Sequence, residues 1–309
     1  MQVAASSAAR NQVAAAPPSA APVRSDVAAI AEARRRIFGW MASTQAPGVS
    51  IAVARGGRLV WSEGIGCADL EQEVPVTPIT RFRVGSVSKP LTSVLLGLLV
   101  QEGRLDLDAP IQTYVPDFPK KAWPITTRQL AGHLAGVRHY KGQEFQIRDH
   151  FATVREGLAI FENDPLLFQP GTKFSYSSYG WNLISAVLEG AAHESFLPMM
   201  QARVFAPAGM AHTSPDDSEH IVPDRGRFYT KTDDTGAVVN AGYVDNSYKW
   251  AGGGFLSTTA DLVTFGDALL EGRLLEPETL RLLWTSQKTS DGKETEYGMG
   301  WGVRTDKKG

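Results

Sequence analysis

An almost uninterrupted apolar stretch, residues 90–100, constrains the fold of this chain more than any other feature. Its sequence is PLTSVLLGLLV, and Gln101, Glu102 and Gly103 follow it. The pattern predicts a helix that follows Ser86 and runs to about Glu102, with Gly103 in the left-handed position that commonly follows a helix. Because the middle of this helix is apolar on every side, we expect it to lie in the centre of the protein. The stretch is too short to span a membrane.

Regular patterns on either side of this helix predict further elements. A helix is expected over residues 25–41, where apolar residues recur on one face. The segments VSIAVA and RLVWSEG flank Gly56-Gly57, so residues 49–63 are expected to form a β-hairpin. Another helix is expected to begin after Thr258, whose hydroxyl can cap it. A further helix is expected near residues 276–285.

The order of these elements predicts an α+β fold. Strands come first, residues 105–250 show mainly helical patterns, and EYGMGWGV is expected to form a strand near the end. We therefore expect one antiparallel sheet formed by both chain ends, over about 45–104 and 255–309, with a helical lobe inserted between them. Residues 1–24 are rich in alanine, proline and serine and are expected to form a disordered leader or tether. Such a tether slightly favours a periplasmic or secreted location over a cytoplasmic one.

Composition excludes several classes of function. The 309 residues carry 31 basic and 33 acidic side chains, which gives a formal net charge of −2, and the two signs are interspersed. We therefore expect no nucleic acid as a partner. Cys67 is the only cysteine, so no disulfide can form within this sequence. His139, His150, His193 and His220 show no metal-ligand spacing, so neither a metal nor a cofactor is expected.

Two reactive side chains, Ser86 and Lys89, stand at the start of the apolar helix. Positions i and i+3 of a helix share a face, so both side chains are expected to point the same way. A serine hydroxyl is a weak nucleophile until a base takes its proton. A lysine becomes that base when burial lowers the pKa of its amine from about 10.4 towards neutrality. The buried root of this helix and the free N–H groups of its first turn favour the neutral amine.

The spacing alone leaves a structural explanation open. A serine followed three residues later by a lysine occurs by chance about once in a chain of this size. Ser290 and Lys293 repeat the spacing in a polar loop that contains a glycine, where no chemistry is expected. Ser86 could equally serve as a helix N-cap.

A second stretch, residues 170–189, adds hydroxyl groups. Its sequence, PGTKFSYSSYGWNLISAVLE, places Tyr176 and Ser178 between a Pro170-Gly171 turn and a helix. A tyrosine displayed on such a loop can carry a proton between a serine and a leaving group. The alternative is an aromatic residue that packs between lobes with its hydroxyl hydrogen-bonded.

Five segments together resemble the serine β-lactamase-related superfamily. In chain order they are FRVGSVSKPLT, GxADLExxVPVT at 66–77, LAGHLAGVRHY at 130–140, PGxxFxYSSYGWNL at 170–183 and AGGGFLST at 251–258. The superfamily comprises class C β-lactamases, penicillin-binding D-alanyl-D-alanine carboxypeptidases, esterases and mitochondrial β-lactamase-like serine proteases, and RHY and YSSYG are most similar to the last group. The resemblance spans about residues 45–304 and implies a β-lactamase/transpeptidase-like α+β fold.

The resemblance also implies roles for four residues. Ser86 would be the acylated nucleophile, and Lys89 would be its activating partner. Tyr176 would pass protons between these two residues and the leaving group. Ser178 stands where many members have asparagine and would contact the substrate with a shorter side chain. The backbone N–H of Ser86 would supply half of an oxyanion hole.

The third motif of the superfamily, HxG or KTG, is missing from this sequence. Three segments look similar to it: Lys288-Thr289-Ser290 in a polar loop, His212-Thr213-Ser214 after a turn, and His133 in GHLAG. None of them is expected to take its place. We therefore expect a domain that is truncated at its C-terminus, weakly active, and prone to self-association through an unpaired sheet edge.

These features predict a metal-free serine hydrolase that works through an acyl-enzyme on Ser86. The expected substrate is a small molecule or peptide with an amide or ester carbonyl, so the activity would be that of a peptidase, amidase or esterase. Penicillin-binding or β-lactamase activity is one alternative. A catalytically impaired interaction module is another, because the third motif is missing.

Overall fold

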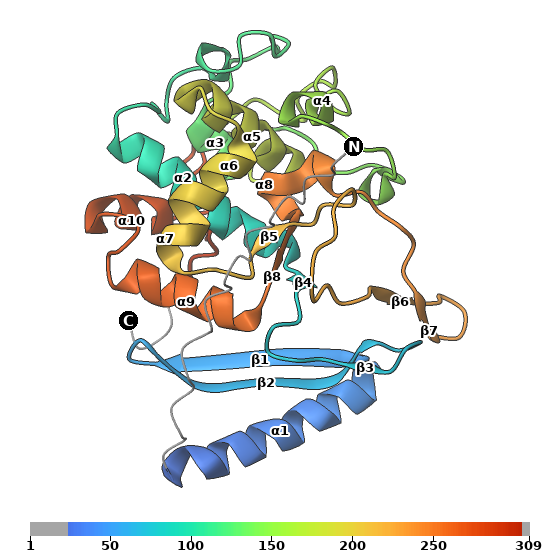
Figure 1. Cartoon of the computed structure of the whole chain (residues 1–309). Coiled ribbons are helices and arrows are strands. Elements are labelled where there is room, and N and C mark those ends of the chain that lie inside the picture. Colours follow the sequence, from blue (N-terminus) through green and yellow to red (C-terminus); the bar gives the residue numbers. More distant parts are fainter. Residues whose placement is uncertain (1–23, 305–309) are drawn as a thin grey trace, which may run out of the picture.

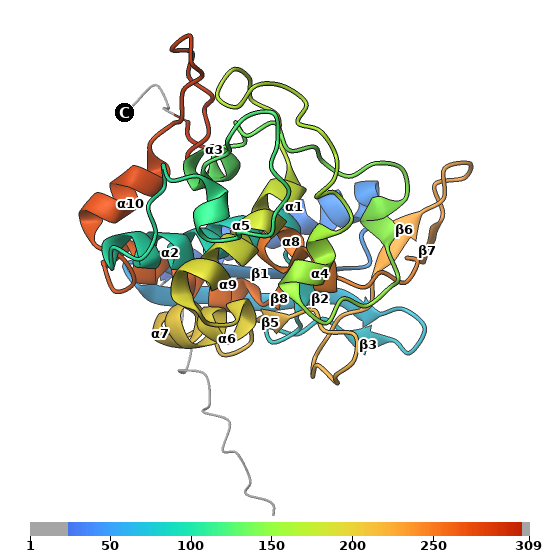
Figure 2. The ribbon, with the colours of Figure 1, turned by 90° about the horizontal axis from the view of Figure 1, so that it is seen from above.

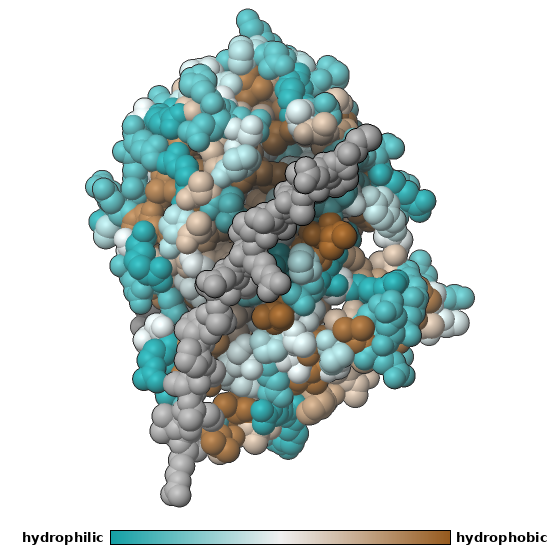
Figure 3. Space-filling view, viewed as in Figure 1, coloured by the Kyte–Doolittle hydropathy of each residue, from teal (hydrophilic) through white to brown (hydrophobic). Residues whose placement is uncertain are grey.

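The computed structural model describes residues 24–304, with side chains from Asp26 onward. This part of the chain combines helices with antiparallel sheets (Figures 1 and 2). The expected leader over residues 1–24 lies outside the described residues, except that Arg24 begins a helix. The face shown in Figure 3 mixes hydrophilic and apolar side chains, as the interspersed charges of the sequence predict.

The first sheet contains the predicted hairpin. Strand β1 (Gly48–Arg55) pairs antiparallel with β2 (Arg58–Asp69), which pairs with the short β3 (Val74–Pro75). The connecting residues Gly56 and Gly57 have φ values of 58° and 70°. Positive φ at both central positions is the geometry of a type I′ turn, which glycine adopts without strain. The hairpin predicted over residues 49–63 is confirmed.

Helices cover both faces of this sheet (Figure 1). Helix α1 (Arg24–Thr44) lies along the outer face, where Arg34 forms an ion pair of 2.8 Å with Glu63 of β2. Helix α9 (Thr259–Leu270) packs on the inner face, and its Thr259 hydroxyl lies 2.9 Å from that of Ser50 in β1. The sheet is therefore the middle layer between α1 and the helical part of the molecule.

The apolar helix lies in the centre, as expected. Helix α2 (Ser88–Gln101) buries its leucines at 91, 95, 96 and 99 with no exposed surface. Gly103 follows it with a φ of 66°, as the pattern predicts. The other described α-helices are α3 (Thr127–Ala131), α4 (Val154–Leu158), α5 (Ser178–Ala192), α6 (Phe196–Met200), α7 (Ala206–Ala208), α8 (Trp250–Gly253) and α10 (Pro277–Trp284).

A second small sheet joins distant parts of the chain. Strand β8 (Phe255–Ser257) pairs antiparallel with both β4 (Phe82–Arg83) and β5 (Ser214–Pro215). This pairing holds the start of α2 beside α8. A separate hairpin is formed by β6 (Tyr229–Lys231) and β7 (Val238–Asn240). The α+β class with antiparallel pairing is confirmed.

The strand expected from EYGMGWGV is not formed in residues 24–304. The segment makes a single antiparallel bridge between Tyr297 and Gly302, and the N–H of Gly298 donates to the carbonyl of Trp301 at 2.8 Å. Gly300 has a φ of 92°, which favours a tight loop over an extended strand. Within the described residues, the first sheet therefore draws its strands from residues 48–75 alone, and β1 is paired on one side only.

No helix in the described part of the chain is long and apolar enough to cross a membrane.

Candidate active site

Ser86 lies in a single turn of 3₁₀ helix, Gly85–Val87, that leads into α2. Gly85 has a φ of 51°, so the chain turns sharply just before the serine. The side chain of Ser86 is exposed and does not cap the helix, because no side-chain hydrogen bond is made at its start. The N-cap alternative for Ser86 is therefore wrong.

Lys89 lies one turn further on, and its side chain is only 1% exposed. Its Nζ lies 3.1 Å from Oγ of Ser86 and 3.2 Å from Oγ of Ser178, and it donates to the carbonyl of Gly252 at 2.7 Å. No carboxylate is among these partners. Burial without a counter-charge lowers the pKa of Lys89 to about 7.

The neighbours of the Lys89 amine can also satisfy its neutral form. A neutral amine has two N–H groups and one lone pair. The carbonyl of Gly252 can only accept a hydrogen bond, and the hydroxyl of Ser178 can accept the second. The lone pair is then free to accept the proton of Ser86. This arrangement can generate a serine nucleophile.

Tyr176 reaches the same serine from the loop that precedes α5. Its hydroxyl donates to Oγ of Ser86 at 2.7 Å, and Nζ of Lys89 lies 4.8 Å from the centre of its ring. Ser178, the first residue of α5, is 4% exposed. The structure therefore brings together all four residues singled out in the sequence. Ser178 contacts Lys89, and its expected contact with a substrate stays a prediction.

Ser86, Tyr176 and Ser178 line a cavity of about 240 Å³. Its walls come from four parts of the chain: the turn before α2, the loop after α3, the start of α5, and the segment that leads into α8. Its lining residues are Arg83, Gly85, Ser86, His139, Tyr140, Phe145, Tyr176, Ser178, Val244, Asn246, Lys249, Gly252 and Gly253.

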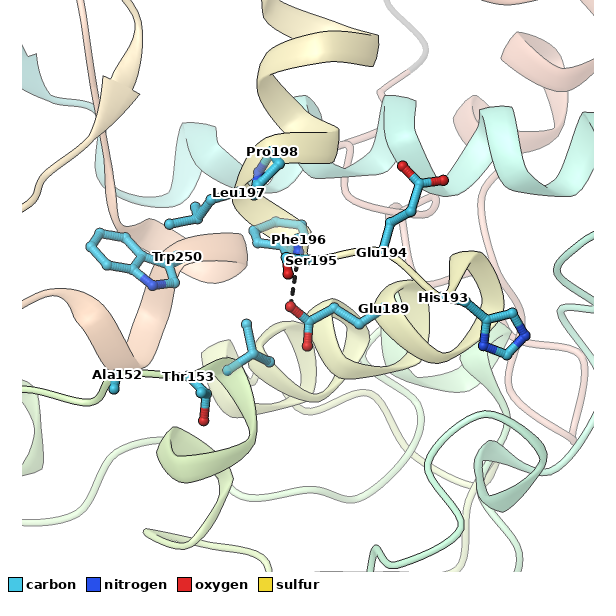
Figure 4. Close-up of a pocket in the computed structure, with 11 residues that line it drawn as sticks. Ala152, Thr153, Glu189, His193, Glu194, Ser195, Phe196, Leu197, Pro198 and Trp250 are labelled. Carbon is cyan, nitrogen blue, oxygen red and sulfur yellow. Dashed lines mark hydrogen bonds between the residues drawn. The ribbon is translucent and has the colours of Figure 1, made fainter.

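A second hollow in the described surface lacks this chemistry. The hollow in Figure 4, about 470 Å³, lies where the end of α5 meets the start of α6. Its Glu189 accepts a hydrogen bond of 2.8 Å from the backbone N–H of Phe196. Among the residues that line it, no nucleophile is paired with a base. The cavity at Ser86 is therefore the candidate active site, although it is the smaller of the two.

Two features of this site were missed in the sequence. Nothing in the sequence marked the carbonyl of Gly252, yet it makes the shortest hydrogen bond of the Lys89 amine. Lys249, 4% exposed, is a second buried amine on the cavity wall and donates to the carbonyl of Phe145 at 3.1 Å. Burial, followed by the nearby charge of Arg83, lowers the pKa of Lys249 to about 8. Every residue has a backbone carbonyl, so no residue type in the sequence could reveal the role of the Gly252 carbonyl.

The three look-alikes of the third motif do not line this cavity. Lys288 pairs with Glu294 at 2.8 Å in an exposed loop. Thr213 hydrogen-bonds to the Asp261 carboxylate at 2.8 Å. His133 is buried against the Tyr176 ring. Within residues 24–304, no group of three or more histidine, cysteine or acidic side chains is placed to hold a metal ion.

Comparison with known proteins agrees with the resemblance seen in the sequence. The beta-lactamase family matches residues 33–309. The human serine beta-lactamase-like protein LACTB, a mitochondrial protein, is 35% identical over 84% of this chain, and the chain spans 63% of that protein's length.

Two solved structures share the fold and at least a quarter of the aligned sequence. The octameric penicillin-binding protein homologue from Pyrococcus abyssi superposes with a TM-score of 0.74 and 25% identity, covering 88% of this chain and 64% of its own. A D-stereospecific amidohydrolase from Streptomyces superposes with a TM-score of 0.67 and 27% identity, covering 82% of this chain and 77% of its own. The chain therefore belongs to the beta-lactamase family of serine hydrolases.

Proposed function

We propose that this chain hydrolyses an amide or ester bond through an acyl-enzyme formed on Ser86, with Lys89 as the base and Tyr176 as the proton relay. One observation carries the proposal. Oγ of Ser86 lies between Nζ of Lys89, at 3.1 Å, and the hydroxyl of Tyr176, at 2.7 Å, and the pKa of Lys89 is lowered to about 7. A nucleophile, a base poised near neutrality and a second proton carrier are thus in contact before any substrate binds.

In the acylation step, Oγ of Ser86 forms a bond to the carbonyl carbon while its proton passes to Nζ of Lys89. The carbonyl oxygen takes the negative charge, and the backbone N–H of Ser86 is one candidate donor to it. The bond to the leaving nitrogen or oxygen then breaks, and the electron pair stays on that atom. Tyr176 gives its proton to the leaving atom and regains one from Lys89.

Deacylation repeats these transfers with water. A water molecule gives a proton to the base and attacks the acyl carbon, the bond to Oγ breaks, and Ser86 recovers its proton. The products are a carboxylic acid and an amine or alcohol. The position of Ser178 beside Lys89 supports a further role in orienting the amine.

A peptide or small molecule with an amide or ester carbonyl is the proposed substrate. The similarity to an amidohydrolase and to a serine beta-lactamase-like protein supports amide chemistry. Penicillin binding is the second candidate, supported by the similarity to a penicillin-binding protein homologue. A non-catalytic module that keeps this fold is the third.

Covalent labelling separates these candidates. A fluorophosphonate forms a bond from phosphorus to Oγ of the reactive serine and expels fluoride. The proposal predicts one adduct on Ser86 by mass spectrometry, absent in Ser86→Ala and strongly reduced in Lys89→Ala. A penicilloyl adduct on Ser86 would favour the second candidate. The absence of any adduct with either reagent on the folded protein would favour the third and overturn the proposal.

We also propose that the chain self-associates through β1. Within residues 24–304 the outer edge of this strand has no partner, and unpaired edges template pairing with another chain. The octameric state of the Pyrococcus abyssi homologue supports assembly in a relative.

A further inference from the structure

Two histidines from outside α5 hold the beginning of that helix. Nδ1 of His133 accepts the backbone N–H of Ser177 at 3.1 Å. Nδ1 of His139 accepts the next backbone N–H, that of Ser178, also at 3.1 Å. The first N–H groups of a helix have no partner within the helix, so these bonds fill positions that a cap or water would otherwise occupy.

The same two rings enclose Tyr176. The ring of His133 lies 4.3 Å from the Tyr176 ring, between centroids, at a tilt of 38°. The ring of His139 meets it edge-on at 5.7 Å and 88°. Tyr176 contacts Ser86, and Ser178 contacts Lys89. Both histidines therefore act on the reacting groups through these two residues.

The hydrogen bonds require neutral rings. A ring nitrogen that accepts from an N–H carries no proton, so the single proton of each neutral imidazole lies on Nε2. Burial lowers the pKa of His133 to about 3. His139 is exposed as a residue, yet partial burial of its ring and the charge of Lys89 lower its pKa as well. Both rings can therefore remain acceptors near neutral pH.

His133 makes the bond to Ser177 at a cost. Its backbone is left-handed, with a φ of 59°, and its Nε2 is buried with no hydrogen-bond partner among the described residues. An apolar side chain at this position would leave no orphaned polar atom, so the bond to Ser177 is the contact that favours histidine here.

The loop that carries His139 is fixed by a partly buried ion-pair network. Arg138, 6% exposed, bonds to the carboxylates of Glu144 and Asp164. Its carbonyl accepts the hydroxyl of Ser177 at 2.7 Å. The loop and the start of α5 are thus joined both by this bond and by the bond from the N–H of Ser178 to His139.

We propose that His133 and His139 are positioning residues that set Tyr176 and Ser178 for reaction at Ser86, each by accepting one of two consecutive backbone N–H groups at the start of α5. This inference rests on the proposed function. It adds a requirement for two specific acceptor atoms that are outside the Ser86, Lys89 and Tyr176 cluster.

Paired substitutions test the requirement for an acceptor. In His139→Asn, the side-chain oxygen lies about where Nδ1 lay, whereas His139→Ala removes the acceptor at an exposed position. His133→Asn and His133→Ala repeat the comparison, because asparagine also accepts the left-handed backbone. His193→Ala and His193→Asn are controls for backbone strain, since His193 has a φ of 54° at the opposite end of α5 (Figure 4).

The readout is fluorophosphonate labelling, resolved into the maximal rate and the half-saturating concentration. We expect each alanine variant to lower the maximal rate at least about tenfold, because small displacements of reacting groups cost that much or more. Each asparagine variant should restore most of it, and the His193 variants should match the unsubstituted protein. Alanine variants that fold and label at the unsubstituted rate would overturn the inference.

A second measurement does not depend on activity. Nitrogen NMR shifts of the two imidazoles in the folded protein at pH 7 should show both protons on Nε2. A proton on Nδ1 of either ring would overturn the inference even if labelling succeeds. If the unsubstituted protein is not labelled while both rings show the expected tautomer, the proposed function fails and the hydrogen-bond assignment stands.

Discussion

Replacing Lys89 with methionine removes a buried amine and tests its protonation state through stability. Burial lowers the pKa of Lys89 from 10.5 to about 7, whereas the unfolded chain keeps the ordinary value. Between these two pH values the unfolded state binds more protons than the folded state, so the free energy of unfolding rises with pH. Well below pH 7 the lowered pKa costs the folded state about 5 kcal/mol of stability. About 2 kcal/mol of this cost disappears between pH 7 and 9.

The assay is urea unfolding of the unsubstituted protein and of Lys89→Met at pH 7, 8 and 9. Other titrating groups are common to both proteins and cancel in the difference. The methionine also leaves the carbonyl of Gly252 and the hydroxyl of Ser178 without their donor, which adds a penalty that does not vary with pH. We expect the stability difference to grow in favour of the lysine by about 2 kcal/mol from pH 7 to 9. A difference that stays constant over this range would refute the lowered pKa.

Three other predictions follow from the site and the sheet. Tyr176→Phe should slow amide hydrolysis about 10²–10⁴-fold but slow fluorophosphonate labelling much less, because fluoride leaves without a proton; equal losses in the two assays would argue against a relay role. Gly252→Ala should lower the labelling rate at Ser86, because the added Cβ would lie 3.0 Å from the carbonyl oxygen of Ser178 and 3.1 Å from Oδ1 of Asn182. An unchanged rate would show that the carbonyl of Gly252 is not needed in its present position. Sedimentation should show concentration-dependent association that Val53→Lys weakens, because a charge on an edge strand opposes pairing; a monomer at all concentrations would contradict assembly through β1.

The parts of this structure that the sequence predicted are those set by local periodicity. The Gly56-Gly57 turn fixes the hairpin, because glycine adopts its two positive φ angles without strain. The apolar pattern fixes the central position of α2. Ser86 and Lys89 share a face because of the helical repeat, so their contact could be expected from their spacing.

Contacts between residues that are far apart in the sequence could not be predicted from its periodicity. Tyr176 was placed near Ser86 by family resemblance, since 90 positions separate them and no local rule brings them together. The carbonyl of Gly252 and the acceptor nitrogens of His133 and His139 were missed, because their partners are backbone groups or a distant amine. Such contacts depend on tertiary packing and leave no residue pattern.

The prediction of a strand from EYGMGWGV was wrong for a different reason. Alternation of apolar and small residues in YGMGWGV is typical of a strand, yet its glycines also permit the tight loop closed by Tyr297 and Gly302. In this loop Gly298 lies against the carbonyl of Leu283, where a Cβ would come within 2.3 Å, so the position requires glycine. Trp301 packs onto α2 instead, and its Nε1 donates to the hydroxyl of Ser93 at 3.1 Å.

The rate of fluorophosphonate labelling as a function of pH, with the adduct located by mass spectrometry, tests the central claim most directly. The claim is that an uncharged Lys89 amine removes the proton of Ser86. It predicts a single adduct on Ser86 whose rate of formation rises through pH about 7, the pKa of the buried amine. Labelling that rises only near the ordinary pKa of lysine, or an adduct on a residue other than Ser86, would contradict it.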